Sequence, residues 1–487
     1  MDIKRAKKEI KDSIEAYLAK DEYGDYMIPS IRQRPILLMG PPGIGKTQVM
    51  EQVAKECKVA LVSYTITHHT RQSAVGLPFI EKKTYDGKEY SVTEYTMSEI
   101  IASVYDKMEE TGLREGILFI DEINCVSETL APTMLQFLQC KTFGNQKIPT
   151  GWIIVAAGNP PEYNKSVRDF DVVTLDRIKK IDVDVNYDVW KEYASAKGLH
   201  PSVLSYLSLK REHFYHIENT ADRICFVTAR GWEDLSAILY GYEDMHFAPD
   251  ENLIHQYLQD EEIARDFGAY YQLYAKYRQD YRIPEILSGS LDESVVESLC
   301  TLAAHAPTDE RLTVAGLLLD GWNTLFLKFR VDDSLEHEAL GLGVLRQARA
   351  SLLEGNTLAA FTEQYRTSQK IRLENHLLDR METDCTERIA RILEQSLSRT
   401  QQERISAPEE EIAILRQENV KIRQDTVNRT SLALHLGFSF AESAFGDGPE
   451  ILFLISDLSH NANAVSFISH FGCEEYFRFN KKLKFQE

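Results

Sequence analysis

GPPGIGKT, at residues 40–47, decides the fold because it matches the pattern GxxxxGKT in full. The apolar run PILLM at 35–39 comes directly before it, and a helical pattern over 48–57 comes directly after it. A glycine-rich loop between a buried strand and a helix presents backbone N–H groups to phosphates, and the helix N-terminus favours their negative charge. We therefore expect this loop to bind the phosphates of a nucleotide. The loop residues are Gly40, Pro41, Pro42, Gly43, Ile44, Gly45, Lys46 and Thr47.

A second motif, ILFIDE at 117–122, supplies carboxylates that complement this loop. Its apolar residues lead to Asp121 and Glu122 at the carboxyl end of a strand, where ligands bind in open α/β sheets. Lys46 would reach the β- and γ-phosphates, Thr47 and Asp121 would hold Mg²⁺, and Glu122 would polarise the attacking water. A strand followed by a plain polar loop is the alternative. The pairing with Lys46 favours a site that hydrolyses a nucleoside triphosphate.

Three further polar elements follow in order along the chain. Asn159 follows Gly158 after the apolar run 152–157, where its amide would orient water or contact the γ-phosphate. Arg177 ends the segment LDR, and Arg230 lies in the segment TARGW at the start of a helical pattern. Alone, an asparagine at a strand end is most often a capping residue, and an isolated arginine most often lies on the surface. Their order and spacing favour a role at the site.

Continuous apolar runs alternate with helical patterns through the first part of the chain. This alternation is typical of a buried parallel sheet that helices cover on both faces. We predict an α/β fold: a P-loop NTPase αβα core with a parallel sheet, a small helical lid and a mostly α-helical C-terminal extension. A β-hairpin is expected around Asp86-Gly87. The expected strands are 35–39, 59–66, 116–120, 152–157 and 178–185.

After about residue 186 the strand signals stop and helical spacing takes over. Helices are expected at 188–209 and 229–241, and two long ones form an antiparallel hairpin on either side of Ser406-Ala407-Pro408. We expect no internal repeat. The predicted segments are the core at 1–185, the lid at 186–248, a helical linker region at 249–345, the helical hairpin at 346–430 and a packed C-terminal module at 431–487.

The composition narrows the function further. The 487 residues carry 75 acidic and 55 basic side chains, a net charge of −20, which disfavours sequence-independent binding to nucleic acid. Seven scattered cysteines without a CxxC pair argue against a disulfide framework or a zinc knuckle. The sequence has no run of about 18 apolar residues, so no membrane span is expected, and no apolar signal core at its start, so no secretion signal is expected. A reducing cytoplasm fits these features best.

These motifs together resemble the AAA+ ATPases, most closely the MoxR-like group of the dynein-related AAA type, over roughly residues 25–245. The resemblance implies an ATP hydrolase that uses ATP and Mg²⁺. It gives the following roles: Lys46 and Thr47 belong to Walker A, Asp121 and Glu122 to Walker B, Asn159 is sensor 1, Arg177 is the arginine finger and Arg230 is sensor 2. Arg168 is a second candidate for the arginine finger.

The same resemblance implies how the protein works with partners. An arginine finger acts in trans, so the chain would assemble into a homo-oligomeric ring, a hexamer by analogy, that remodels or activates a protein in a chaperone-like way. MoxR-like ATPases are often paired with proteins that carry a von Willebrand factor A domain. The stretch 70–79 is either a pore loop or an insertion packed on the ring surface.

Two other classes of function remain open at this point. One is a nucleic-acid-directed motor of the restriction-subunit type, which the net charge of −20 disfavours. The other is a nucleotide-gated scaffold that hardly turns over, which the presence of Glu122 disfavours. Adenine is preferred over guanine by resemblance alone.

Overall fold

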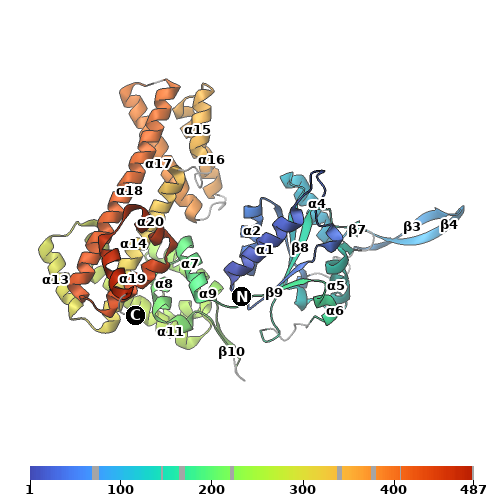
Figure 1. Ribbon diagram of the computed structural model, residues 1–487, viewed down its shortest axis with the longest axis horizontal. Helices are drawn as coiled ribbons and strands as arrows, with labels where there is room; N and C mark the ends of the chain where they lie inside the picture. The colour runs from blue at the N-terminus through green and yellow to red at the C-terminus, as the bar shows by residue number, and fades with distance from the viewer. Residues whose placement is uncertain are drawn as a thin grey trace. The chain divides into compact units, whose positions relative to one another are not determined.

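A five-stranded parallel sheet is the centre of the N-terminal half (Figure 1). Its strands lie in the order β2-β5-β8-β1-β9, and every neighbouring pair is parallel. All five strands predicted from apolar runs are present. Their bounds are β1 Ile36–Met39, β2 Ala60–Thr65, β5 Gly116–Asp121, β8 Trp152–Gly158 and β9 Lys179–Asp182.

Helices cover both faces of this sheet because both faces of its strands are apolar. In β1, Ile36 and Leu38 pack in one cluster with residues of α1 (Ile3–Leu18) and α2 (Lys46–Cys57). Leu37 and Met39 pack in another cluster with α4 (Glu99–Thr111) and α5 (Ala131–Cys140). Side chains that alternate between two buried faces are what a central parallel strand requires. The predicted αβα P-loop NTPase fold is confirmed.

The expected hairpin is also present, as β3 (Pro78–Tyr85) and β4 (Lys88–Tyr95). Asp86 and Gly87 form its two-residue turn and both have positive φ, 51° and 76°, as a type I′ turn requires. Figure 1 shows this ribbon reaching away from the sheet, and nearly all its side chains are exposed.

The expectation that strands end before residue 186 is wrong. β10 (His216–Asn219) and β11 (Ile224–Val227) form an antiparallel pair. Each has four residues, and in β11 only Cys225 and Val227 are buried, so the alternation is too short to stand out in the sequence. Three other short elements were also not predicted, namely β6 Thr142–Phe143, β7 Gln146–Lys147 and α6 Val172–Leu175.

The computed structural model describes residues 1–68, 76–143, 146–163, 170–219, 224–336, 343–374, 380–405 and 407–484. The chain divides into two compact units. The first comprises 1–190 and 214–234, and the second comprises 191–213 and 235–487. The five-segment division expected from the sequence stays a prediction.

Helices appear where the sequence predicts them after residue 186. They are α7 Tyr187–Lys197, α8 Pro201–Leu209 and α9 Ala229–Asp244. The remaining helices belong to the second unit: α10 Glu251–Tyr257, α11 Glu261–Asp280, α12 Ile283–Ser288, α13 Glu293–Ala304, α14 Thr308–Glu336, α15 Val344–Leu353, α16 Leu358–Glu374, α17 Arg380–Glu403, α18 Pro408–Phe445, α19 Pro449–His460, α20 Ala462–Phe471 and α21 Glu474–Lys484.

Two long helices, α14 and α18, organise the core of the second unit. Trp322 of α14 is fully buried and donates its indole N–H to the carbonyl of Ala433 in α18 at 2.9 Å. A Cβ at Gly437 would lie 2.6 Å from the Trp322 ring, so only glycine allows this close approach. The helical hairpin expected on either side of 406–408 is present as α17 and α18, which lie side by side in Figure 1.

Within the described residues, no single helix is long and apolar enough to cross a membrane. One bent pair, Pro449–His460 with Ala462–Phe471, meets the criterion by length and composition only.

Candidate nucleotide site

The strand order brings the predicted site residues to one edge of the sheet. In a parallel sheet all carboxyl ends lie at the same edge. Gly40 follows β1, Asn159 follows β8, and Asp121 ends β5, and these three strands are neighbours in the sheet. Residues separated by more than a hundred positions therefore meet at one place.

Lys46 is the buried centre of this edge. Its Nζ donates hydrogen bonds to the carbonyls of Gly40 and Pro41 and to Oδ1 of Asn159, each at 2.8 Å. Burial lowers the pKa of Lys46 to about 8, the charges of Asp121 and Glu122 oppose that shift, and Arg230 adds to it. An ammonium group has three donors, so these three oxygens satisfy it completely. Phosphate oxygens entering the loop would take the place of one of these acceptors.

Glycines shape the loop in front of Lys46. Gly43 and Gly45 have φ values of 73° and 90°, which a residue with a side chain rarely adopts. A Cβ at Gly43 would lie 2.9 Å from Thr228. Gly45 is the N-cap of α2, and among the described residues no side chain caps this helix end. Its first N–H groups therefore point toward the loop, as an anion site requires.

Thr47, Asp121 and Glu122 form a hydrogen-bonded group beside Lys46. Thr47 Oγ1 donates to Asp121 Oδ2 at 3.0 Å, and the Glu122 N–H donates to the other oxygen of Asp121 at 2.9 Å. A hydroxyl and a carboxylate at this distance are the hard oxygen ligands that Mg²⁺ prefers. The donor set and the glycine cradle fit a magnesium nucleotide, with Thr47 and Asp121 as the residues that would hold the metal.

Glu122 lies in a strained backbone conformation. Its φ is 57° and its ψ is 34°, in the left-handed region, where a residue other than glycine costs about 1–3 kcal/mol. Its side chain accepts a hydrogen bond from Thr67 Oγ1 at 3.1 Å. Thr67 belongs to the 3-10 turn Ile66–His68, which follows β2. The carboxylate of Glu122 therefore contacts Thr67, whereas the carboxylate of Asp121 contacts Thr47.

Asn159 is held in place by Asn124, which the sequence analysis did not identify. Asn124 Nδ2 donates to the Asn159 carbonyl at 2.8 Å, and its own Oδ1 is buried and accepts no hydrogen bond from the described residues. A Cβ at Gly158 would lie 2.5 Å from that oxygen, so glycine is needed beside it. This support fixes the backbone of Asn159 while its side chain contacts Lys46.

Arg230 reaches the same site from the first turn of α9. Its charge contributes to the lowered pKa of Lys46, although its own side chain is exposed. Trp232, two residues later, is fully buried and donates to the carbonyl of Phe214 at 3.1 Å, which anchors this helix start. Tyr215 donates its hydroxyl to the carbonyl of Pro42 at 2.9 Å and so ties the phosphate loop to this region.

Arg177 lies at the amino ends of the strands, opposite the carboxyl ends where the phosphate loop lies. It precedes β9, and Lys179 at the start of that strand donates its N–H to the carbonyl of Pro35, which precedes β1. The phosphate loop follows the other end of β1, so Arg177 cannot reach the site of its own chain. Its exposed side chain donates to Gln139 at the end of α5.

The structure therefore brings together all the predicted site residues except Arg177. Arg168 and residues 70–75 of the stretch 70–79 lie outside the described residues. Sequence reasoning missed Thr67, Asn124 and Tyr215. The rule that carboxyl ends of parallel strands meet would have found Thr67, which follows β2, but no motif marks the other two.

Comparison with known families agrees with this geometry. Residues 36–174 match the family model described as "ATPase family associated with various cellular activities (AAA)". The chain contains an AAA ATPase domain. An AAA domain implies nucleotide binding, and the matched segment holds Lys46, Asp121 and Asn159.

Among solved structures, this chain is similar to a RuvB mutant from Thermotoga maritima. The alignment has 15% identity and a TM-score of 0.25, and it covers 44% of this chain and 52% of that chain, about half its length. A comparison with curated proteins found no match.

Proposed function

We propose that this AAA protein is a MoxR-like ATP hydrolase that works in an oligomeric ring and remodels or activates a protein partner. One observation carries the proposal. Lys46, Thr47, Asp121 and Glu122 converge at one edge of the sheet, whereas Arg177 lies exposed at the other edge. A site that is complete except for its arginine needs a second chain.

The proposed chemistry assigns one task to each side chain. Lys46 binds the β- and γ-phosphates and exchanges its contact with Asn159 for phosphate oxygens. Thr47 and Asp121 would hold Mg²⁺, which when bound would supply positive charge to the phosphates. Glu122 leaves Thr67 and accepts a hydrogen bond from the attacking water. Asn159 holds that water in line, and Arg230 binds the γ-phosphate from the start of α9.

The surface around Arg177 supports completion of the site by a neighbouring chain. Val172 and Val173 of α6 are 80% and 59% exposed, a few residues from Arg177. Exposed apolar side chains beside an exposed arginine are typical of a surface that is buried on assembly. In a ring, here proposed as a hexamer, this edge would face the phosphate loop of the next chain.

The net charge and the β3–β4 ribbon support the choice of a protein as the target. The net charge of −20 disfavours a nucleic-acid target. The ribbon offers exposed Phe79, Ile80 and Tyr90 for contact with another polypeptide. By resemblance the partner carries a von Willebrand factor A domain. The seven scattered cysteines favour a ring that works in the reducing cytoplasm.

Mixing two inactive variants tests the proposal. Arg177→Ala is expected to bind ATP and to lose about 10³–10⁵-fold in turnover, as loss of an arginine finger does elsewhere. Lys46→Ala is expected to bind no ATP but to keep its own Arg177. Mixed rings would then contain sites with an intact Lys46 next to an intact Arg177, so some turnover should return.

The result to look for is recovery that follows the mixing ratio. Native mass measurement of the mixture shows whether mixed rings form. Formation of mixed rings without any recovery of turnover would contradict completion of the site in trans.

A further inference from the structure

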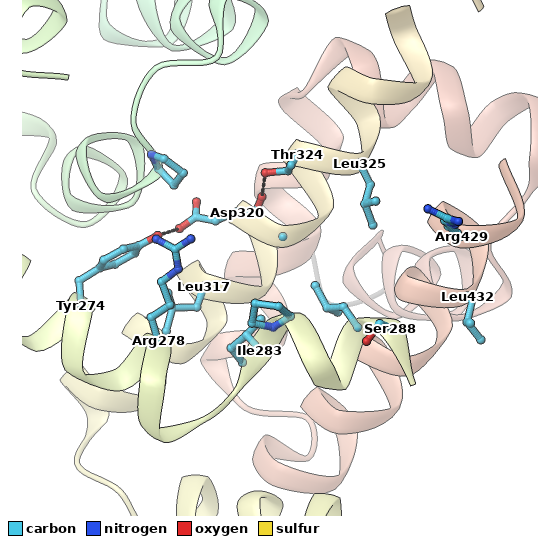
Figure 2. A pocket seen from close by; sticks show the side chains of 14 residues that line it. Tyr274, Arg278, Ile283, Ser288, Leu317, Asp320, Thr324, Leu325, Arg429 and Leu432 are labelled. Carbon is cyan, nitrogen blue, oxygen red and sulfur yellow. Dashed lines mark hydrogen bonds between the residues drawn. The ribbon is translucent and has the colours of Figure 1, made fainter. Parts of the chain in front are cut away.

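A cavity of about 480 Å³ lies within the second unit, among α8, α11, α12, α14 and α18 (Figure 2). Its size suits a small organic molecule. Most of its lining is apolar, from Ile283, Leu287, Leu317, Leu325 and Leu432. The cavity is formed only by second-unit residues, so an inference about its ligand does not rest on the proposed ATPase function.

One buried carboxylate dominates the polar part of this lining. Asp320 of α14 is 8% exposed, and its Oδ2 accepts a hydrogen bond from the hydroxyl of Tyr274 at 2.7 Å. Within the described residues its other oxygen, Oδ1, accepts no hydrogen bond and is not sealed from solvent. Figure 2 shows the carboxylate beside Tyr274 at one end of the cavity. One oxygen of a buried acid therefore faces the cavity and lacks a donor.

The cations near Asp320 are paired with other carboxylates. Burial raises the pKa of Asp320 to about 7, the Tyr274 hydrogen bond opposes that shift, and the charge of Asp457 adds to it. The charges of Arg278 and Lys191 also oppose it. Each of these cations has a carboxylate partner of its own. Arg278 pairs with Glu243 at 3.2 Å, and Lys191 pairs with Asp457.

The second arginine of the lining does not change this conclusion. Arg429 is exposed and lies at the far end of the cavity from Asp320 in Figure 2. An exposed guanidinium is already solvated, so it gains little from an anionic ligand. A buried, half-satisfied carboxylate gains much more from a cation, because such hydrogen bonds are about twice as strong as neutral ones.

We propose that this cavity binds a small organic cation, a single ammonium group on an apolar body. The ammonium group would donate to Asp320 Oδ1. The apolar body would lie against Ile283, Leu287 and Leu317, toward Leu432. The hydroxyl of Tyr274 keeps the other oxygen of Asp320 occupied and so fixes the orientation of the carboxylate.

Three probes with one alkyl chain test the charge preference. They are n-octylamine, n-octanol and n-octanoate, titrated into the full chain by calorimetry at pH 7.5. We expect one-to-one binding of octylamine, at least about tenfold tighter than octanol and tighter still than octanoate. Absence of octylamine binding, or tighter binding of octanoate than of octylamine, would overturn the proposal.

Two variants place the probe in the cavity. Asp320→Asn keeps the shape of the side chain and an acceptor for Tyr274, and it should weaken octylamine binding about tenfold or more while leaving octanol unchanged. Arg429→Gln should not weaken octylamine binding. Equal loss of octylamine and octanol binding in Asp320→Asn, with a normal unfolding transition, would show that Asp320 only supports the helices and would overturn its role.

A steric pair provides a control against variants that fail to fold. Leu432 at the cavity and Leu452 of α19 outside it are both half-exposed, 46% and 43%. Leu432→Trp should block octylamine binding, and Leu452→Trp should not. If both variants bind octylamine like the unaltered chain, the probe binds elsewhere and the proposal is wrong.

Discussion

The two units each contain a buried charged group, and these groups are satisfied in opposite ways. Lys46 donates to three oxygens at 2.8 Å, so every donor of its ammonium group is used. Asp320 accepts one side-chain hydrogen bond, from Tyr274, within the part of the chain that the structure describes. Burial moves both pKa values toward neutrality, to about 8 for Lys46 and about 7 for Asp320.

The difference shows how each region is suited to its ligand. The loop around Lys46 already has the geometry of a phosphate site, because glycines at 43 and 45 allow the chain to wrap around the ammonium group. A ligand there exchanges one set of oxygens for another. At Asp320 a ligand would add a contact that the fold does not provide. The first site is preorganised, and the second has an unmet hydrogen-bonding capacity.

The largest expected effect at the Lys46 site concerns Glu122. Glu122→Gln should keep nucleotide binding and lower ATP turnover about 10²–10⁴-fold, because the amide cannot accept the proton of the attacking water as a carboxylate does. Turnover is measured by phosphate release, and binding by a fluorescent ATP analogue. Thr67→Val, which removes the hydrogen bond to Glu122, is the control and should retain most turnover. Normal turnover in Glu122→Gln would contradict the role of Glu122 as the group that activates the attacking water.

Two buried lysines allow a matched test of Lys46 itself. Lys141 is also buried, its pKa is also lowered to about 8 by burial, and it donates to Gln33. Lys46→Met should weaken ATP binding by about 2–5 kcal/mol, because the phosphates lose a buried cation, whereas Lys141→Met should bind ATP normally. Equilibrium titration of both variants gives the result. Equal weakening in both would mean that burial of a cation in this unit, and not its place in the loop, determines binding.

The smallest expected effect concerns the pH dependence at Asp320. Its pKa is about 7 in the folded chain, against 3.8 for an ordinary aspartate, so the folded state binds a proton that the unfolded state has released between these values. Stability from this group is complete below about pH 4 and is lost as the pH rises toward 7. Asp320→Asn removes this pH-dependent loss. As the pH rises over this range, the free energy of unfolding of the variant relative to the unaltered chain should therefore increase by up to about 1.4 kcal/mol per pH unit.

Urea unfolding at pH 5 and pH 7 measures this difference. Asp447→Asn, at an exposed position in the same unit, is the control. If the difference in the free energy of unfolding between Asp320→Asn and the unaltered chain is the same at both pH values, the raised pKa of Asp320 is contradicted, and with it the comparison between the two buried charges.

The sequence predicts the first site well because its signals are local. The loop 40–47 and the segment 117–122 each contain their functional side chains next to the strand that positions them. Parallel strand order then brings them together without further information. Thr67 was overlooked although it follows β2, because a single residue after a strand carries no distinctive pattern. Asn124 was missed because its role depends on which strands become neighbours.

The Asp320 cavity could not be predicted in this way. Its walls come from α8, α11, α12, α14 and α18, which span residues 201 to 445. The segment LLLDGWN around Asp320 shows only one charged residue among mostly apolar ones. The sequence predicted a helical region at 249–345 and a helical hairpin at 346–430, but neither the individual helices at 249–345 nor which helix faces meet. The strands β10 and β11 were missed for a related reason, since four residues give too short a pattern.

The most direct test of the central claim is ATP turnover per chain over a wide range of protein concentration, with the assembly mass recorded at each point. We predict that turnover rises steeply as the ring forms, because Arg177 of one chain completes the site at Lys46 of the next. Turnover that stays constant while the protein remains monomeric would contradict this prediction, because each site would then be complete without a neighbour.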